Sequence, residues 1–177
     1  MIAPDKREIR RSVRAEIKNL SLEERESLSA QMFNKIEAMP EVQSASVVAL
    51  FASLHDEPQT ANIIEKLSHK KRVVLPRIKG EEMDFYDMAE GLCEGAFGIM
   101  EPTATTPIEP SEIDLMIVPG VAFTRDGARL GRGKGFYDKY LASEGFRAYT
   151  IGVCYPCQVL DELPTEPHDC TLDRVVY

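Results

Sequence analysis

The sequence predicts an α/β fold in which helices flank a mainly parallel central sheet, with a pair of helices before the first strand. Segments with helical spacing of apolar residues alternate with short apolar runs, which is the pattern of a parallel α/β sheet. The runs 46–51 and 113–118 are almost wholly apolar, as expected of strands buried on both faces. The chain has 177 residues, enough for one domain with a substantial core, so we treat residues 1–177 as a single domain.

The first element is an amphipathic helix over residues 5–20, whose apolar positions recur at helical spacing. Lys6, Arg10 and Arg14 follow one another at intervals of four, so they lie along one side of this helix. A run of like charges is most often a solvated face. An anionic ligand would nevertheless relieve the repulsion between these cations.

A second helix is predicted from Ser21 to about Ala38. Its start, Ser21 to Glu24, matches a capping box. Pro40 stops the helix because proline cannot continue it.

The rest of the chain alternates in the same way between apolar runs and helical patterns. The expected elements are a strand at 46–51, a loop at 52–57, a helix from Pro58 to His69, a strand at 72–76, weaker extended segments at 82–88 and 97–100, a loop at 103–112, a strand at 113–118, a helix from Phe136 to about Ser143, and strands at 148–153 and 173–177. Ligands of such folds bind beyond the C-terminal ends of the strands. We therefore expect Glu57, Arg77 and the segment 119–138 to lie there.

The composition is that of an ordinary globular protein, with 44% hydrophobic and 28% charged residues. The formal net charge of −8 argues against a surface for nucleic acids or anionic membranes. No apolar run approaches the roughly 20 residues of a membrane-spanning helix, and the N-terminal stretch has no apolar signal-peptide core. We expect a cytoplasmic protein without nucleic-acid or membrane partners.

The stretch 130–138 combines alternate glycines with two cations, two aromatic residues and a carboxylate. Glycines let backbone N–H groups approach a ligand closely, and Arg132 and Lys134 are anion binders of two kinds, a planar fork and a point charge. The sequence therefore predicts a phosphate-binding loop that leads into a helix. Neither common nucleotide motif is satisfied, because Gly135 stands where a Walker A loop needs Ser or Thr and Phe136 stands at the last glycine of a dinucleotide fingerprint.

The longer string 119–141 closely resembles the signature of the 5-formyltetrahydrofolate cyclo-ligase family, also called methenyltetrahydrofolate synthetases. The resemblance covers nearly the whole chain. Further segments similar to that family are Lys6 to Arg10, Ser53 to Thr60, Leu75 to Arg77 with Met83, and Leu163 to Asp169 followed by Asp173.

This resemblance implies an ATP-dependent ring closure in a small α/β fold. The formyl group of 5-formyltetrahydrofolate would be joined to a second folate nitrogen, giving 5,10-methenyltetrahydrofolate, ADP and phosphate. In the mechanism understood for the family, the formyl oxygen attacks the γ-phosphate, the second nitrogen attacks the activated carbon, and phosphate leaves. The implied cofactor is Mg²⁺ and the co-substrate is ATP. The implied partners are small molecules, and we expect a monomer.

The resemblance also implies site residues. Arg132 and Lys134 would be catalytic, and Asp138 and Asp169 would bind the metal. The residues implied for ATP are Lys6, Arg10, Arg129, Leu130, Gly131, Arg132, Gly133, Lys134, Gly135, Phe136 and Tyr137. Those implied for the folate are Ala52, Glu57, Phe136 and Tyr137.

Each of these residue types also has an ordinary structural explanation. The two aspartates could be a helix first-turn acid and a loop acid, and Glu57 could favour the dipole of the helix after it. Aromatic side chains such as Phe136 and Tyr137 most often pack in a core, and the family usually has tyrosine where Phe136 stands. The chemistry nevertheless suits these residues, because phosphoryl transfer requires mainly positioning and charge neutralisation. A carboxylate can also pair with the amino and ring N–H groups of a pterin.

Cys154 and Cys157 form a CxxC, and His168 and Cys170 follow, which could suggest a zinc site or a redox pair. A redox pair belongs at a helix N-terminus, whereas this one follows a strand. Its spacing is also unlike the paired zinc motifs. We interpret these cysteines as structural or incidental.

The leading hypothesis is thus a folate cyclo-ligase. The alternative is a non-catalytic nucleotide- or folate-binding module of the same fold, and a zinc or redox protein is third.

Overall fold

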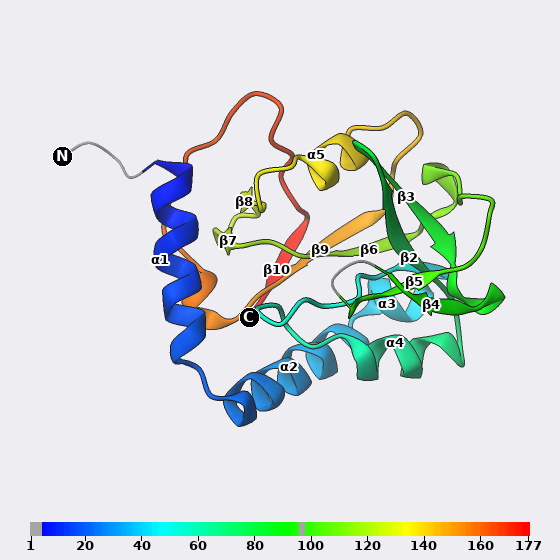
Figure 1. Cartoon of the computed structure of the whole chain (residues 1–177), viewed down its shortest axis with the longest axis horizontal. Helices are drawn as coiled ribbons and strands as arrows, with labels where there is room; N and C mark the ends of the chain where they lie inside the picture. The colour runs from blue at the N-terminus through cyan, green and yellow to red at the C-terminus, as the bar shows by residue number, and fades with distance from the viewer. Residues whose placement is uncertain (1–4, 96–97) are drawn as a thin grey trace.

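A computed structural model describes residues 5–95 and 98–177, and its layers are seen in Figure 1. The centre is a six-stranded sheet in the order β10-β9-β6-β1-β2-β3. All neighbouring strands are parallel except β2 and β3, which form an antiparallel hairpin. The strands are β1 (Val47–Ala49), β2 (Arg72–Lys79), β3 (Glu82–Asp87), β6 (Leu115–Val118), β9 (Tyr149–Val153) and β10 (Arg174–Val176).

Helices cover both faces of this sheet, and in Figure 1 α2 and α4 lie below it while α5 lies above. The helices are α1 (Lys6–Asn19), α2 (Leu22–Glu37), α3 (Pro40–Ser44), α4 (Ala61–Ser68) and α5 (Phe136–Leu141). Successive strand residues point to opposite faces. Val48 and Leu50 therefore belong to the apolar cluster between the sheet and helices α1 to α4. Ala49 belongs to the cluster between the opposite face of the sheet and α5. The predicted fold class is confirmed, including the N-terminal pair of helices.

Two small hairpins lie outside the main sheet. One pairs β4 (Leu92–Glu94) with β5 (Met100–Pro102), and the other pairs β7 (Ala122–Phe123) with β8 (Arg129–Leu130). Neither hairpin was predicted from the sequence. Of the extended segment expected at 97–100, residue 97 lies outside the described residues.

The first two helices begin as their sequences indicate. The Ser21 hydroxyl accepts from the N–H of Glu24, and the Glu24 carboxylate accepts from the N–H of Ser21, so the predicted capping box is present. Asp5 and Glu8 form the same arrangement at the start of α1.

The start predicted at Pro58 for the helix before β2 is wrong, because α4 begins only at Ala61. The buried Thr60 hydroxyl donates to the Phe51 carbonyl at 2.6 Å and accepts from the N–H of Ser53. These bonds tie the segment before α4 to the end of β1, and this tertiary contact overrides the local helix signal of the proline.

Strand β2 continues to Lys79, beyond the predicted end at Pro76. Its pairing with β1 ends at Val74, but its hairpin with β3 continues until Lys79 faces Glu82.

None of the helices in the described ranges is long and apolar enough to cross a membrane.

Candidate active site

A cavity lies at the point where the order of the strands in the sheet reverses. From β1 the chain passes through α4 to β2 on one side, and it later returns to β6 on the other side of β1. Ligands of parallel α/β folds bind at such a switch point, beyond the C-terminal ends of the strands. A cavity of about 570 Å³ lies here, lined by Phe51 and Ala52 after β1 and by Pro119 and Gly120 after β6.

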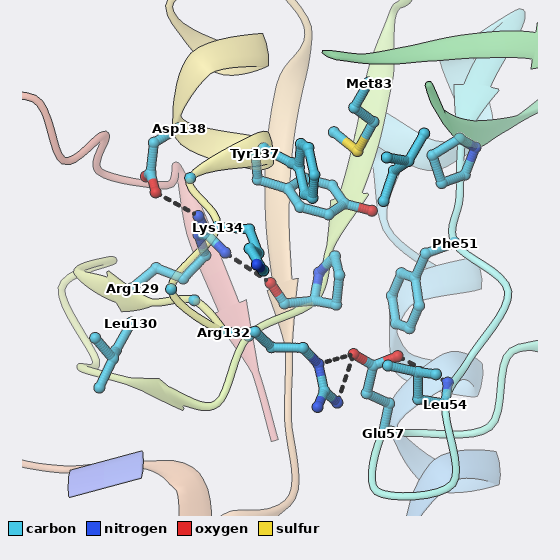
Figure 2. A pocket seen from close by; sticks show the side chains of 18 of the residues that line it. Phe51, Leu54, Glu57, Met83, Arg129, Leu130, Arg132, Lys134, Tyr137 and Asp138 are labelled. Atoms are coloured by element: carbon cyan, nitrogen blue, oxygen red, sulfur yellow. Dashed lines mark hydrogen bonds and ion pairs between the residues drawn. The ribbon is translucent and has the colours of Figure 1, made fainter. Parts of the chain in front are cut away.

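The structure brings every predicted site residue to the wall of this one cavity. They are Lys6, Arg10, Ala52, Glu57, Arg129, Leu130, Gly131, Arg132, Gly133, Lys134, Gly135, Phe136, Tyr137, Asp138 and Asp169. An apolar wall, which includes Phe51, Leu54 and Met83, stands opposite the glycine-rich loop (Figure 2). The cavity therefore has one cationic and one apolar side.

Arg77 was expected at this end of the sheet but does not face the cavity. Its guanidinium donates to the carbonyls of Pro102 and Ala104 and lies 3.8 Å from the ring centroid of Tyr86. Alternation along β2 is the reason, since its neighbours Pro76 and Ile78 line the cavity instead.

The glycine-rich loop has a backbone that requires glycine at two positions. Gly133 and Gly135 have φ values of 103° and 72°, a region that residues with a Cβ adopt at a cost. Helix α1 supports the loop, because Arg10 Nε donates to the Gly131 carbonyl at 2.7 Å. The loop thus lines the cavity, with the exposed Lys134 at its centre.

Arg132 is paired with two carboxylates from the loop after β1. Its Nε and Nη2 donate to Glu57 Oε1 at 3.1 and 3.0 Å (Figure 2), and its Nη1 and Nη2 donate to the two oxygens of Asp56. The other oxygen of Glu57 accepts from the N–H of Leu54 at 2.9 Å. Burial raises the pKa of Glu57 above its ordinary value, although the Leu54 N–H and the Arg132 charge oppose the shift.

Arg129 is buried, with 3% of its side chain exposed, and two of its guanidinium nitrogens donate to protein groups, whereas Nε has no hydrogen-bond partner among the described residues. Nη1 donates to the Pro119 carbonyl at 3.1 Å and Nη2 to Asp138 Oδ2 at 3.0 Å. The guanidinium carbon also lies 5.5 Å from the ring centroid of Tyr137. Arg129 therefore joins the end of β6 to α5.

Lys6 of α1 pairs with the C-terminal loop at the wall of the cavity. Its Nζ donates to Glu166 at 2.8 Å and to Asp169 at 2.9 Å. Partial burial acts to lower the pKa of Lys6, but the two carboxylates outweigh it and the net shift is upward. For Asp169, burial acts to raise the pKa, and hydrogen bonds from Lys6 and from the N–H of Glu166 bring the net pKa below its usual range.

Asp138 has the donor chemistry of a ligand for a hard cation. One oxygen accepts from Arg129, while the other, Oδ1, is buried without a hydrogen-bond partner among the described residues. An orphaned carboxylate oxygen suits Mg²⁺, which prefers oxygen ligands. Asp169 lines the same cavity, and the Sγ of its neighbour Cys170 lies 3.8 Å from the Asp138 carbonyl.

The two aromatic residues at the start of α5 line the cavity and also pack on the core cluster beneath the helix. The ring centroid of Tyr137 lies 6.5 Å from that of Phe85 in an edge-on arrangement. Burial raises the pKa of Tyr137 well above its ordinary value, so its hydroxyl stays protonated. The cavity therefore presents a flat ring beside the glycine-rich loop.

Sequence reasoning missed three residues that hold the walls of the cavity. Asp56 pairs with Arg132, the Tyr155 hydroxyl donates to the Glu57 carbonyl at 3.0 Å, and the Gln158 amide donates to the carbonyls of Gly120 and Val121. Asp56 could have been found from its place beside Glu57. Nothing local distinguishes Tyr155 or Gln158.

The cysteines of the CxxC do not join the cavity. Cys154 is buried and Cys157 half-buried, both are free thiols, and burial raises the pKa of each. A reactive redox thiol needs a lowered pKa. Within residues 5–95 and 98–177, the potential metal-ligand cluster is Glu166, His168 and Asp169, which contains no cysteine.

Comparison with known proteins then decides the family. The model of the 5-formyltetrahydrofolate cyclo-ligase family matches residues 2–177. The chain belongs to this family. The 5-formyltetrahydrofolate cyclo-ligase of Escherichia coli K12 is 30% identical over 174 residues, covering 93% of this chain and 95% of that protein. The mouse protein of the same name is 28% identical, covering 97% and 93%.

Solved structures agree with this membership. The NMR structure of Aquifex aeolicus 5,10-methenyltetrahydrofolate synthetase is 35% identical, with a TM-score of 0.86, and the match covers 97% of this chain and 88% of that one. The synthetase of Mycoplasma pneumoniae is 28% identical, with a TM-score of 0.80 over 98% of both chains. The family predicted from the sequence is confirmed.

Proposed function

We propose that this protein is a 5-formyltetrahydrofolate cyclo-ligase, which uses ATP to convert 5-formyltetrahydrofolate to 5,10-methenyltetrahydrofolate. The observation that carries the proposal is the gathering of α1, the loop after β1, the glycine-rich loop and the C-terminal loop around one cavity. The names of the relatives support it. We further propose that residues 1–177 act as one catalytic domain, in the cytoplasm and as a monomer.

The cationic side of the cavity is assigned to ATP. Lys134 is exposed in the cavity wall, and Arg132 and Arg10 adjoin it on the same loop and on α1. Phosphoryl transfer is catalysed mainly by positioning and by neutralising the charge on the transferred group. We assign Lys134 and Arg132 to the γ-phosphate, and Lys6, Arg10 and the backbone of residues 129–137 to binding the nucleotide.

The apolar side of the cavity is assigned to the folate. Glu57 is 6% exposed and reaches the cavity beside Phe51 and Leu54. A carboxylate in that position can accept two N–H bonds from the edge of a pterin. Ala52 and the rings of Phe136 and Tyr137 would contact the flat faces of the same ring system.

The buried Oδ1 of Asp138, which has no hydrogen-bond partner within residues 5–95 and 98–177, supports a Mg²⁺ site, for which Asp138 and Asp169 would be the protein ligands. A bound Mg²⁺ would neutralise charge on the phosphates. Lys6 and the N–H of Glu166 both donate to Oδ2 of Asp169, so its Oδ1 is the oxygen that would bind the metal.

These assignments give each side chain a task in the reaction. Glu57 and the apolar wall hold the formyl group toward the glycine-rich loop, and Lys134 and Arg132 hold the γ-phosphate. The formyl oxygen attacks that phosphorus as the bond to ADP breaks. The second folate nitrogen then attacks the activated formyl carbon and releases its proton to solvent, and the former formyl oxygen leaves with the phosphate.

The experiment is an absorbance assay for methenyltetrahydrofolate with 5-formyltetrahydrofolate, ATP and Mg²⁺. We expect ATP-dependent product formation by the wild type and none by Lys134→Ala. The matched control is Lys139→Ala, which removes an exposed lysine outside the cavity and should keep wild-type turnover. Folate binding without any turnover by the folded wild type would instead support the non-catalytic binding module.

A further inference from the structure

The pairing of Arg132 with two carboxylates conflicts with its proposed use. Four N–H contacts of its guanidinium go to Asp56 and Glu57, and a guanidinium has five N–H donors. Arg132 therefore cannot bind a phosphate through two N–H groups until its hydrogen bonds with one of these carboxylates are broken. Arg132 must exchange partners when the substrates bind.

The geometry indicates that Asp56, rather than Glu57, remains bound to Arg132. Asp56 uses both of its oxygens on the end-on edge formed by Nη1 and Nη2, which is the stronger fork-to-fork arrangement. Glu57 uses only Oε1 on the side-on edge formed by Nε and Nη2, because Oε2 is held by the Leu54 N–H. Asp56 also faces a second cation, Arg14 of α1, at 3.9 Å.

The two carboxylates also differ in where they lie. Glu57 lines the cavity, whereas Asp56 lies outside its wall. A substrate in the cavity can therefore take Glu57 from Arg132 without touching Asp56. The side-on edge of the guanidinium is then free while the end-on edge is still held.

We propose that Asp56 is a positioning residue for phosphoryl transfer. It keeps the Arg132 guanidinium oriented once the folate has bound to Glu57 in place of Arg132. This inference rests on the proposed function. The freed Nε and Nη2 then donate to the γ-phosphate, so the folate creates part of the ATP site. Because binding coupling is reciprocal, each substrate tightens the binding of the other.

The test measures the affinity of a non-hydrolysable ATP analogue with Mg²⁺, in the presence and absence of 5-formyltetrahydrofolate. We expect the folate to tighten analogue binding by about tenfold in the wild type, within the usual range of coupling between sites. In Asp56→Asn this coupling should fall below about twofold. The affinity for the folate alone should stay near that of the wild type, because Glu57 is intact.

Two further variants separate positioning from folding. In Glu57→Gln the analogue should bind without folate about as tightly as it binds the wild type with folate, because Arg132 is already released. Asp161→Asn removes one negative charge from an exposed pair with Arg125, so it should retain wild-type coupling. In steady state, Asp56→Asn should lower kcat and raise the KM for ATP, and at saturating ATP its folate KM should also rise, because the reciprocal coupling is lost.

The inference is overturned if Asp56→Asn keeps the wild-type coupling. It is also overturned if that variant loses affinity for both ligands equally together with a lower Tm, which would indicate a structural role. In both cases the wild type still forms methenyltetrahydrofolate. A wild type that binds no folate overturns the proposed function, and the inference with it.

Discussion

The substitution Arg129→Met removes the buried cation that joins the end of β6 to α5. Asp138 would keep its carboxylate in a site where 16% of its side chain is exposed, and among the described residues neither Oδ2 nor Oδ1 would then have a partner. Leaving one member of a buried ion pair costs about 3–5 kcal/mol, and the Pro119 carbonyl also loses a donor. We take about 3 kcal/mol as the expected loss, since the carboxylate keeps some access to water.

Urea unfolding followed by circular dichroism measures this loss. For a chain of this size about 3 kcal/mol corresponds to a fall in Tm of roughly 10 °C. The matched control is Arg125→Met, since Arg125 is an exposed arginine paired with an exposed aspartate, and its unfolding curve should not move. The double variant Arg129→Met with Asp138→Leu should recover part of the loss, because an apolar pair replaces an unpaired charge.

A loss below about 1 kcal/mol in Arg129→Met, or strict additivity in the double variant, would refute the reasoning. Arg129 would then be available as a direct phosphate ligand. The pairing with Asp138 would be incidental.

Three further predictions concern charge, packing and metal. Burial acts to raise the pKa of Asp56, but Arg132 outweighs it and the net pKa is lowered. Its stabilisation is therefore present above the ordinary carboxyl pKa of about 4 and is lost as the pH falls through the lower folded value. Urea unfolding of Asp56→Asn between neutral and acid pH should show a shallower acid loss than the wild type, and an equal slope would contradict this. Phe85 is fully buried under α5, so Phe85→Ala should lower the free energy of unfolding by about 3–5 kcal/mol, as measured by thermal unfolding. A loss under about 1 kcal/mol would mean that the surrounding side chains collapse and leave no cavity. A chelator should stop turnover, and excess Mg²⁺ should restore it. Asp138→Asn should need a higher Mg²⁺ concentration than the wild type for half-maximal rate. An unchanged Mg²⁺ requirement would show that Asp138 is not a metal ligand.

Much of the fold could be predicted because its strands are buried on both faces. The runs 46–51 and 113–118 are apolar for that reason, and β1 and β6 lie within them. The start of α4 could not be predicted, because the bonds of Thr60 to the end of β1 decide it. Local propensity contains no information about such a contact.

The candidate site could be predicted as a set of residues but not as a set of pairs. The glycine-rich loop indicates anion binding through its composition alone, and two of its glycines, Gly133 and Gly135, adopt positive φ. The partners of Arg132 lie about 75 positions away on another loop, so no local spacing relates them. Arg129 was expected to clamp a phosphate from the loop, but its pairing with the Pro119 carbonyl and Asp138 depends on the packing of α5 against the end of β6.

The central claim is that the cavity holds the γ-phosphate of ATP against the formyl oxygen of the folate. Its most direct test uses 5-formyltetrahydrofolate labelled with ¹⁸O in the formyl group, with the released phosphate examined by ³¹P NMR. The account predicts that each phosphate formed with methenyltetrahydrofolate carries one ¹⁸O atom, and that Lys134→Ala releases none. Unlabelled phosphate accompanying methenyltetrahydrofolate formation by the wild type would contradict it.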